Sequence, residues 1–174
     1  RTLAFTIHGD MNISIIDELP KNRRPIITKV VEPDHMDKVY DFMRKEMYAG
    51  QQCFVIYPII EESEKMDWKA SDTGYKKLSE TIFKEYKVGY IHGKMKKETK
   101  DEQMSAMANN EVQCLVSTTV VEVGIDIPNA TIMVIENAER FGLTQLHQLR
   151  GRIGRGTKQS YCVLVKHKDT PEAE

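Results

Sequence analysis

Short apolar runs recur along the chain and predict the strands of a sheet. They are rich in β-branched residues and lack a polar residue at every second position, which is typical of strands covered on both faces. The predicted strands cover residues 26–31, 53–57, 88–91, 112–117, 132–135 and 161–165, with one more candidate at residues 2–7. Residues 8–25 have the glycine, asparagine and proline content of a linker.

Between the strands, apolar residues return every three or four positions and predict helices. The first helix is indicated by Met36, Val39, Tyr40, Met43 and Met47. Asp34 is its expected N-cap, in a capping box with Asp37, and Gly50 is its expected end.

Two more helices are expected before the predicted strand at residues 112–117. One is marked by Leu78, Ile82, Phe83 and Tyr86, and the other covers residues 96–108. Residues 61–73 are mostly polar, and this stretch is predicted to be a surface loop.

Strands and helices alternate throughout, which indicates an α/β fold with an open, mainly parallel sheet and helices on both faces. In such sheets, binding sites gather at the carboxyl ends of the strands. Four informative loops are expected at that edge: residues 58–62, 92–95, 118–126 and the residues that lead to Gln148.

The stretch from Gln148 to Arg155 carries the strongest candidate chemistry. If it is helical, Gln148, Arg152 and Arg155 share one face, because they lie at positions i, i+4 and i+7. Guanidinium groups suit phosphate oxygens, since they stay charged and donate two hydrogen bonds at once. Gly151 and Gly154 each cost about 1 kcal/mol inside a helix, so they indicate either a close backbone approach or the end of the helix.

Composition narrows the class of protein. The 174 residues are 40% hydrophobic and 29% charged, with a net charge of −1, as in a globular domain. Any contact with nucleic acid must therefore use a local basic patch. The three cysteines fall inside predicted strands, which indicates buried, reduced thiols, and the histidines show no metal-ligand spacing. No apolar run reaches the roughly 18 residues of a membrane span.

The run from Gln148 to Arg155 matches Q-x-x-G-R-x-x-R, the sixth motif of superfamily 2 helicases, and with residues 136–147 it resembles the RecG family of branched-DNA helicases. The resemblance covers nearly the whole chain. It implies a RecA-like fold, with residues 1–24 as the remnant of a preceding motor domain and linker, and 25–174 as the helicase C-terminal domain. It also implies a cytoplasmic, nucleoid-associated bacterial protein.

The resemblance also implies roles for individual residues. Gln148, Arg152 and Arg155 would act catalytically on the γ-phosphoryl group of ATP. Residues 118–126 resemble the fifth motif, in which Gly124 and Asp126 would contact the nucleotide. The expected DNA contacts are Gly93, Lys94, Thr118 and Thr119. Each of these segments also fits an ordinary solvated helix or turn.

The sequence contains no phosphate-binding G-x-x-x-x-G-K-[ST] loop and no D-E-x-x acid pair in the required context. ATP and Mg²⁺ would therefore be held mainly by the absent first motor domain, and this chain alone is expected to be inactive.

The leading hypothesis is the second motor domain of a RecG-type ATP-dependent DNA helicase that remodels stalled forks and Holliday junctions. Its partners would be branched DNA and the preceding motor domain and N-terminal wedge domain of the same chain. Two alternatives stay open: the motor of a transcription-repair coupling translocase, and a non-enzymatic interaction module.

Overall fold

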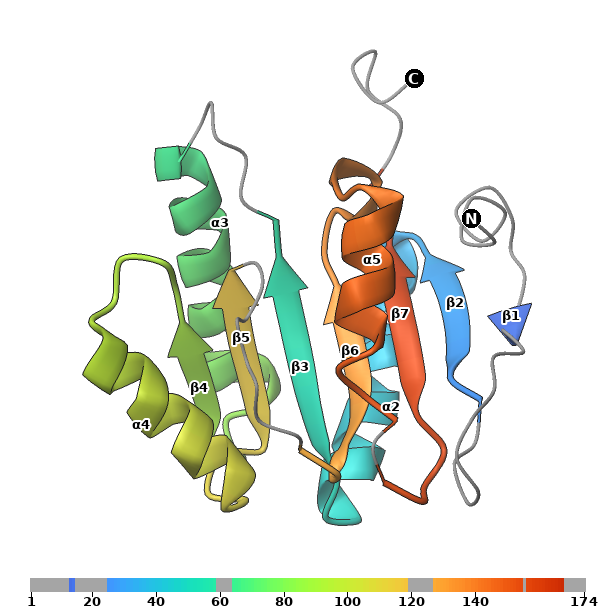
Figure 1. Ribbon diagram of the computed structural model, residues 1–174, viewed down its shortest axis with the longest axis horizontal. Helices are drawn as coiled ribbons and strands as arrows, with labels where there is room; N and C mark the ends of the chain where they lie inside the picture. Colours follow the sequence, from blue (N-terminus) through green and yellow to red (C-terminus); the bar gives the residue numbers. More distant parts are fainter. Residues whose placement is uncertain (1–12, 15–24, 59–63, 119–126, 155, 168–174) are drawn as a thin grey trace.

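The computed structural model describes residues 13–14, 25–58, 64–118, 127–154 and 156–167 (Figure 1). The strands are β1 (Ile13–Ser14), β2 (Ile27–Val31), β3 (Gln52–Tyr57), β4 (Val88–Ile91), β5 (Cys114–Thr118), β6 (Ala130–Ile135) and β7 (Tyr161–Val165). The α-helices are α2 (Met36–Tyr48), α3 (Glu64–Lys77), α4 (Lys97–Ala108) and α5 (Leu143–Arg150). Shorter helical turns are η1 (Pro33–His35), η3 (Leu78–Ile82) and η4 (Ala138–Arg140).

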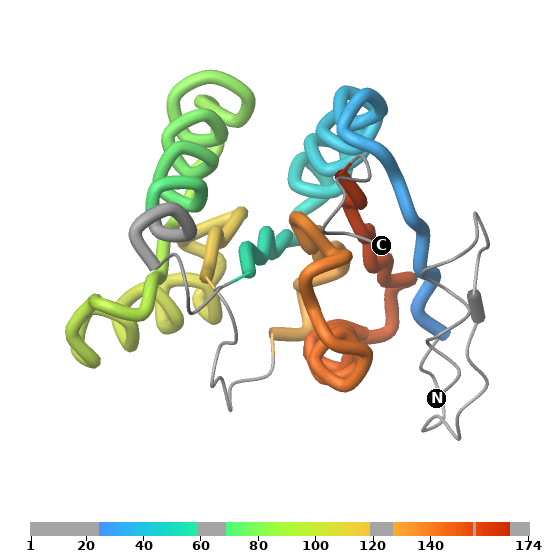
Figure 2. Tube along the Cα trace, turned by 90° about the horizontal axis from the view of Figure 1, so that it is seen from above, coloured from blue at the N-terminus to red at the C-terminus, as the bar shows by residue number. Residues whose placement is uncertain are grey.

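The strands form one sheet in the order β1-β2-β7-β6-β3-β5-β4, in which only the β1–β2 pair is antiparallel. Helices α4 and α5 cover one face, and α2 and α3 cover the other (Figure 2). Each face has its own apolar core, with α4 and α5 residues in one cluster and α2 residues in the other. The predicted open, mainly parallel sheet with helices on both faces is confirmed.

The apolar runs located the strands well because the central strands are covered on both sides. Every residue of β5 and β6 is buried. Strand β7 has the predicted bounds, whereas β5 begins two residues later and ends one residue later than predicted. The predicted strand at residues 2–7 lies outside the described residues, as does most of the predicted linker.

The start of α2 differs from the prediction. The chain enters through the 3₁₀ turn η1, and no side-chain hydrogen bond caps either element. Pro33 starts this turn, so Asp34 lies inside it and cannot act as the predicted N-cap. The predicted end is confirmed, because Gly50 follows the helix with a φ of +97°.

The predicted loop at residues 61–73 is wrong, because α3 is helical from Glu64. Over its described side chains, at residues 69–77, this helix packs through polar and aromatic groups that form no aliphatic pattern. The buried hydroxyl of Ser71 lies 2.6 Å from the hydroxyl of Tyr90, and the Tyr75 ring stacks on Tyr90 at 5.0 Å. A β-carbon at Gly74 would overlap the Tyr57 hydroxyl, so glycine lets the helix lie close to β3.

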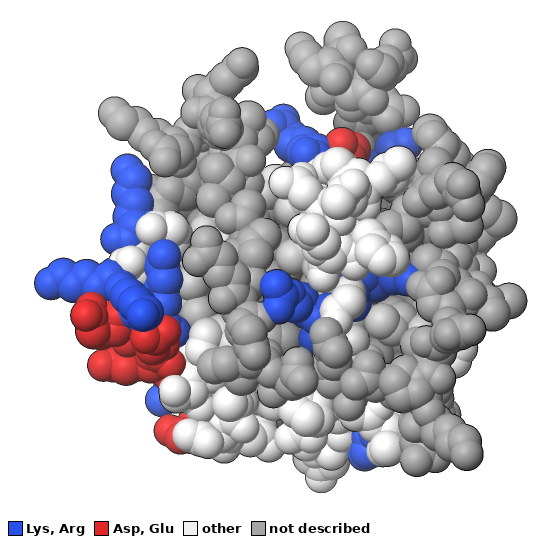
Figure 3. Space-filling model, viewed as in Figure 1, with Lys and Arg blue, Asp and Glu red and all other residues white. Residues whose placement is uncertain are grey.

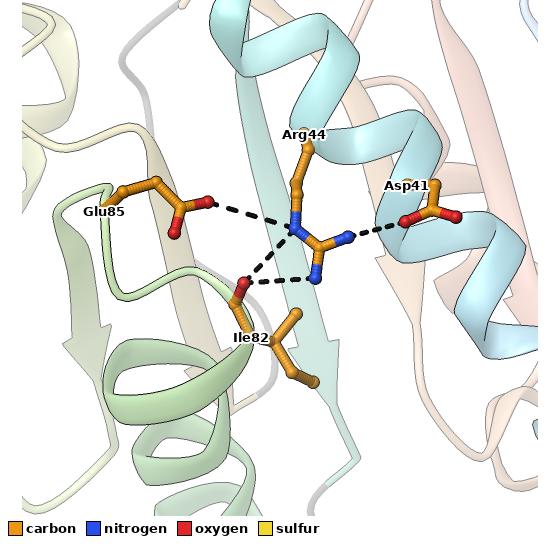
Figure 4. Close-up of polar contacts among 4 residues, drawn as sticks. All are labelled: Asp41, Arg44, Ile82 and Glu85. Carbon is orange, nitrogen blue, oxygen red and sulfur yellow. Dashed lines mark hydrogen bonds and ion pairs between the residues drawn. The ribbon is translucent and has the colours of Figure 1, made fainter.

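Arg44 of α2 joins this helix to the turn that follows α3 (Figure 4). After α3, the chain forms the π-helical turn η3, and the Arg44 guanidinium donates to the Ile82 carbonyl over 3.3 and 3.2 Å. The same group pairs with Asp41 at 2.6 Å and with Glu85 at 3.9 Å. It also stands 5.6 Å from the centroid of the buried Phe83 ring. Arg44 therefore holds α2 against the turn that follows α3, on the same face of the sheet.

Candidate functional site

Helix α5 ends earlier than its apolar spacing suggests. Its last residue is Arg150. In the turns that follow, the Arg152 amide donates a hydrogen bond to the Leu149 carbonyl, and the Ile153 amide donates one to the Arg150 carbonyl. Gly154 then has a φ of +77°, in the left-handed region that favours glycine. The two glycines therefore mark the end of the helix.

The shared face predicted for Gln148, Arg152 and Arg155 required a helix through this stretch, and it is wrong for Gln148 and Arg152 because the helix ends between them. Gln148 lies on α5 and is exposed, whereas Arg152 lies in the following turn and is half-buried. Arg155 lies outside the described residues. The turn after α5 changes the direction of the chain, so helical spacing does not relate Arg152 to Gln148.

The arginine turn lies toward the amino ends of the strands. Figure 1 shows α5 running against the strand direction, so the helix ends near the beginning of β2. The Arg150 guanidinium donates to the Thr28 hydroxyl at 3.2 Å, and a β-carbon on Gly154 would lie 3.1 Å from Ile26. The residues that lead to Gln148 therefore lie at the carboxyl edge, as the described loop after β4 does, whereas the arginine turn does not.

At the carboxyl end of β5, Thr118 is buried with 7% of its surface exposed. Its Oγ1 is shielded from solvent and has no hydrogen-bond partner among the described residues. A buried hydroxyl without a partner costs about 1–3 kcal/mol, so the site suits an incoming polar ligand. Thr119, Gly124 and Asp126, the other candidates of this segment, lie outside the described residues.

The loop after β4 has the predicted position and is held by local hydrogen bonds. The Lys94 amide donates to His92 Nδ1 at 3.2 Å, and Lys100 Nζ donates to the Gly93 carbonyl at 3.3 Å. Burial and the nearby Lys100 and Lys94 lower the pKa of His92, which favours the neutral ring that Nδ1 needs to accept this bond. Lys100 therefore positions the loop and is less available to a ligand.

Gly93 has no packing reason to be glycine. It is exposed, its φ is not positive, and a β-carbon there would meet no atom within 4 Å. Lys94, Lys96 and Lys97 are exposed around it. Figure 3 shows lysine side chains over the start of α4, with acidic side chains gathered directly beside them. Lys94, Lys96 and Lys97 thus form a local basic patch, although the whole chain has a net charge of −1.

Two residues of interest were not found from the sequence. Arg150 is buried with 7% of its surface exposed. The available signal was its spacing from Leu146 and Leu149, which lie on the buried face of α5, and from Ile153, which is buried in the turn after it. His167 follows β7, and its amide donates to Glu139 Oε1 at 3.2 Å. Its Nε2 lies 3.4 Å from Glu136 Oε1. No local pattern marks such a long-range pair.

The pair between His167 and Glu136 predicts a pH dependence of stability. The hydrogen bond to Glu136 is the main cause that raises the pKa of His167 above its usual value, with burial opposing it. A raised folded-state pKa stabilises fully below the unfolded-state pKa, and this contribution is lost as the pH rises through the folded value. From about pH 6 to pH 8, the melting temperature of Glu136→Gln should therefore change less than that of the wild-type chain. Glu111→Gln is the control for charge removal, and equal slopes for Glu136→Gln and the wild type would contradict the pairing.

The cysteines are as predicted: Cys53, Cys114 and Cys162 are buried and free. Burial raises the pKa of Cys114 and of Cys162 to about 12, so both stay protonated. Within the described ranges, no three histidine, cysteine or acidic residues are grouped as metal ligands need. No described helix has the length and apolarity to cross a bilayer.

Comparisons with known proteins agree with the fold. The family of helicase conserved C-terminal domains matches residues 34–157. The chain is 51% identical over 173 residues to the ATP-dependent DNA helicase RecG of Synechocystis sp., covering 99% of this chain and 21% of that protein. For the RecG of Thermotoga maritima the identity is 48% over 165 residues, covering 95% and 21%. The chain thus spans about a fifth of the length of these relatives.

A solved structure of RecG bound to a three-way DNA junction is also similar. It has a TM-score of 0.73 and 46% identity, and the match covers 90% of this chain and 20% of that one. Domain 2 of the DEAD-box helicase Mss116p, bound to an RNA duplex, has a TM-score of 0.58 at 19% identity, covering 82% and 54%. At that identity the second likeness shows the fold alone.

Proposed function

The chain belongs to the family of helicase conserved C-terminal domains, and we propose that it is the second motor domain of a RecG-type ATP-dependent DNA helicase that remodels branched DNA. The observation that carries the proposal is the glycine-bounded turn after α5, which presents Arg152 beside a helix anchored on the sheet. In this assignment residues 25–174 form the domain, and residues 1–24 belong to the preceding motor domain and linker.

The arginines act on a nucleotide that is held mainly by the preceding motor domain. That domain supplies the phosphate loop and holds Mg²⁺, and this chain alone neither binds ATP tightly nor hydrolyses it. Arg152 and Arg155 stabilise the charge that develops on the γ-phosphoryl group during hydrolysis. Gln148, Gly124 and Asp126 complete the nucleotide-facing side.

The DNA backbone is contacted at the carboxyl edge of β4 and β5. The orphaned Thr118 hydroxyl supports this role, as does the open space around Gly93, which allows a phosphate to approach the backbone. Thr119 and Lys94 act alongside them. Contacts of this kind bind phosphate without reading the base sequence, which suits a motor that moves along any DNA.

Branched DNA is the proposed substrate, since the similar RecG structure is bound to a three-way junction. Branch recognition falls to an N-terminal wedge domain of the full-length protein. From this role we infer that the protein lies in the bacterial cytoplasm, associated with the nucleoid.

The proposal is tested by removing charge from the basic patch in the full-length protein. The triple variant Lys94→Gln, Lys96→Gln and Lys97→Gln should bind forked DNA more weakly. The plot of log affinity against log salt concentration should become shallower by about one for each phosphate that the variant no longer neutralises. Binding is measured by fluorescence anisotropy at several salt concentrations, beside ATP-dependent unwinding of the same fork.

Lys84→Gln with Lys87→Gln is the matched control, because both lysines are exposed just before β4, at the opposite edge of the sheet. Its salt dependence should equal that of the wild type. If the salt dependence of the triple variant equals that of the wild type, the DNA does not contact these lysines. If the wild-type protein shows no ATP-dependent unwinding, the proposed function is overturned.

A further inference from the structure

Arg150 is a buried cation in the last turn of α5. It exposes 7% of its surface, and an arginine guanidinium stays charged in proteins. A buried charge is costly unless it is paired and hydrogen-bonded. One partner is Thr28 on β2, which is 1% exposed and whose hydroxyl accepts a hydrogen bond at 3.2 Å.

The surroundings of Arg150 fix its place on the sheet. Thr28 pairs in register with Cys162 of the neighbouring strand β7. The positive charge of Arg150 lies near enough to Cys162 to oppose the rise that burial causes in the pKa of its thiol. The guanidinium therefore lies over the β2–β7 pair, beside the apolar cluster that contains Leu146 and Leu149 of α5. A cation in the last turn also interacts favourably with the helix dipole.

The arginine turn is attached to the beginning of β2 at two points. Before the turn, the Arg150 side chain contacts Thr28 while its carbonyl accepts from the Ile153 amide. After the turn, Gly154 is buried and lies so close to Ile26 that a β-carbon would be 3.1 Å from it. Arg152 lies between these two attachments, and its backbone is therefore held against the sheet at both sides.

We infer that Arg150 is a positioning residue for ATP hydrolysis: its buried contact with Thr28 fixes the turn from which Arg152 reaches the nucleotide. The inference rests on the proposed function. Arg150 does not touch the nucleotide and acts through the placement of Arg152. A displacement of about 1 Å at a catalytic group costs about 100-fold in rate. A turn held rigidly against the sheet would therefore keep Arg152 in the position that catalysis needs.

The test uses the full-length helicase and DNA-stimulated ATP hydrolysis. Arg150→Met keeps most of the side-chain volume, and kcat should fall by about 10- to 100-fold while KM for ATP changes little. Arg150→Lys should restore part of kcat, because it retains the charge. Thr28→Val removes the acceptor at nearly constant volume, so kcat should fall less than in Arg150→Met.

Thr131→Val is the matched control, because Thr131 is equally buried in β6 but donates to Glu46. It should cost similar thermal stability and leave kcat unchanged. Wild-type kcat in folded Arg150→Met or in Thr28→Val would overturn the inference, as would equal losses in Thr28→Val and Thr131→Val. If Arg150→Met does not fold, Thr28→Val decides alone. Arg152→Ala separates the two proposals, since normal kcat there would overturn the proposed function itself.

Discussion

Replacing Arg155 with alanine in the full-length protein should abolish ATP hydrolysis, with kcat lowered by about 10³- to 10⁵-fold. An arginine that meets the γ-phosphoryl group stabilises charge that exists only in the transition state, so its loss acts on the rate and little on the binding of ATP. Binding of branched DNA should remain, because the basic patch belongs to α4 and the loop after β4. Phosphate release with and without forked DNA, beside anisotropy of the same fork, measures both.

Arg140→Ala is the control for that experiment. Arg140 is exposed and lies in η4, ahead of α5. The variant should turn over ATP at the wild-type rate. Near-normal hydrolysis by the Arg155→Ala protein would refute the motor assignment for this arginine, and parallel loss of DNA binding would show a general folding defect.

Replacing Gln52 with leucine should lower the free energy of unfolding by about 3 kcal/mol, since two buried carbonyls would lose their donor. Gln52 is 1% exposed, and its Nε2 donates to the carbonyls of Met107 and Val112, at 2.7 Å each. These carbonyls belong to the end of α4 and the connection to β5. Urea denaturation of the chain measures the loss.

The same substitution should also weaken DNA binding by the full-length protein, because α4 carries part of the basic patch. Gln51→Leu is the control, since the neighbouring Gln51 is also buried but has no side-chain hydrogen bond within the described residues. It should lower the free energy of unfolding by less than Gln52→Leu does, because no side-chain hydrogen bond is lost. A similar loss for both glutamines would show that burial alone, and not the two hydrogen bonds, sets the cost.

Strand positions could be predicted because burial on both faces leaves an uninterrupted apolar run. Helix α3 could not, because its packing depends on Ser71, Tyr75 and a glycine, none of which produces an apolar stripe. The end of α5 was open in the sequence, since Gly151 and Gly154 fitted either a close approach or a helix end. The left-handed backbone conformation of Gly154 shows that the glycines mark the end of the helix.

Long-range polar contacts escaped prediction for a different reason. Gln52 binds residues 55 and 60 positions away, and Arg150 binds Thr28 across 122 positions. Such pairs depend on which strands become neighbours, and the order of strands is not visible in local spacing. The candidate residues after β4 and β5 were easier, because each follows its strand directly.

The strand order has a mechanical consequence. The arginine turn contacts β2, at one side of the sheet, whereas the lysines belong to the loop after β4 and to α4 at the other side, with β7, β6, β3 and β5 between them. Close-packed cores on both faces make this slab stiff. In the proposed motor domain, a small rotation about the nucleotide would therefore move the lysine end through a longer arc, so the sheet would act as a lever arm that converts closure at ATP into a step along the phosphodiester track.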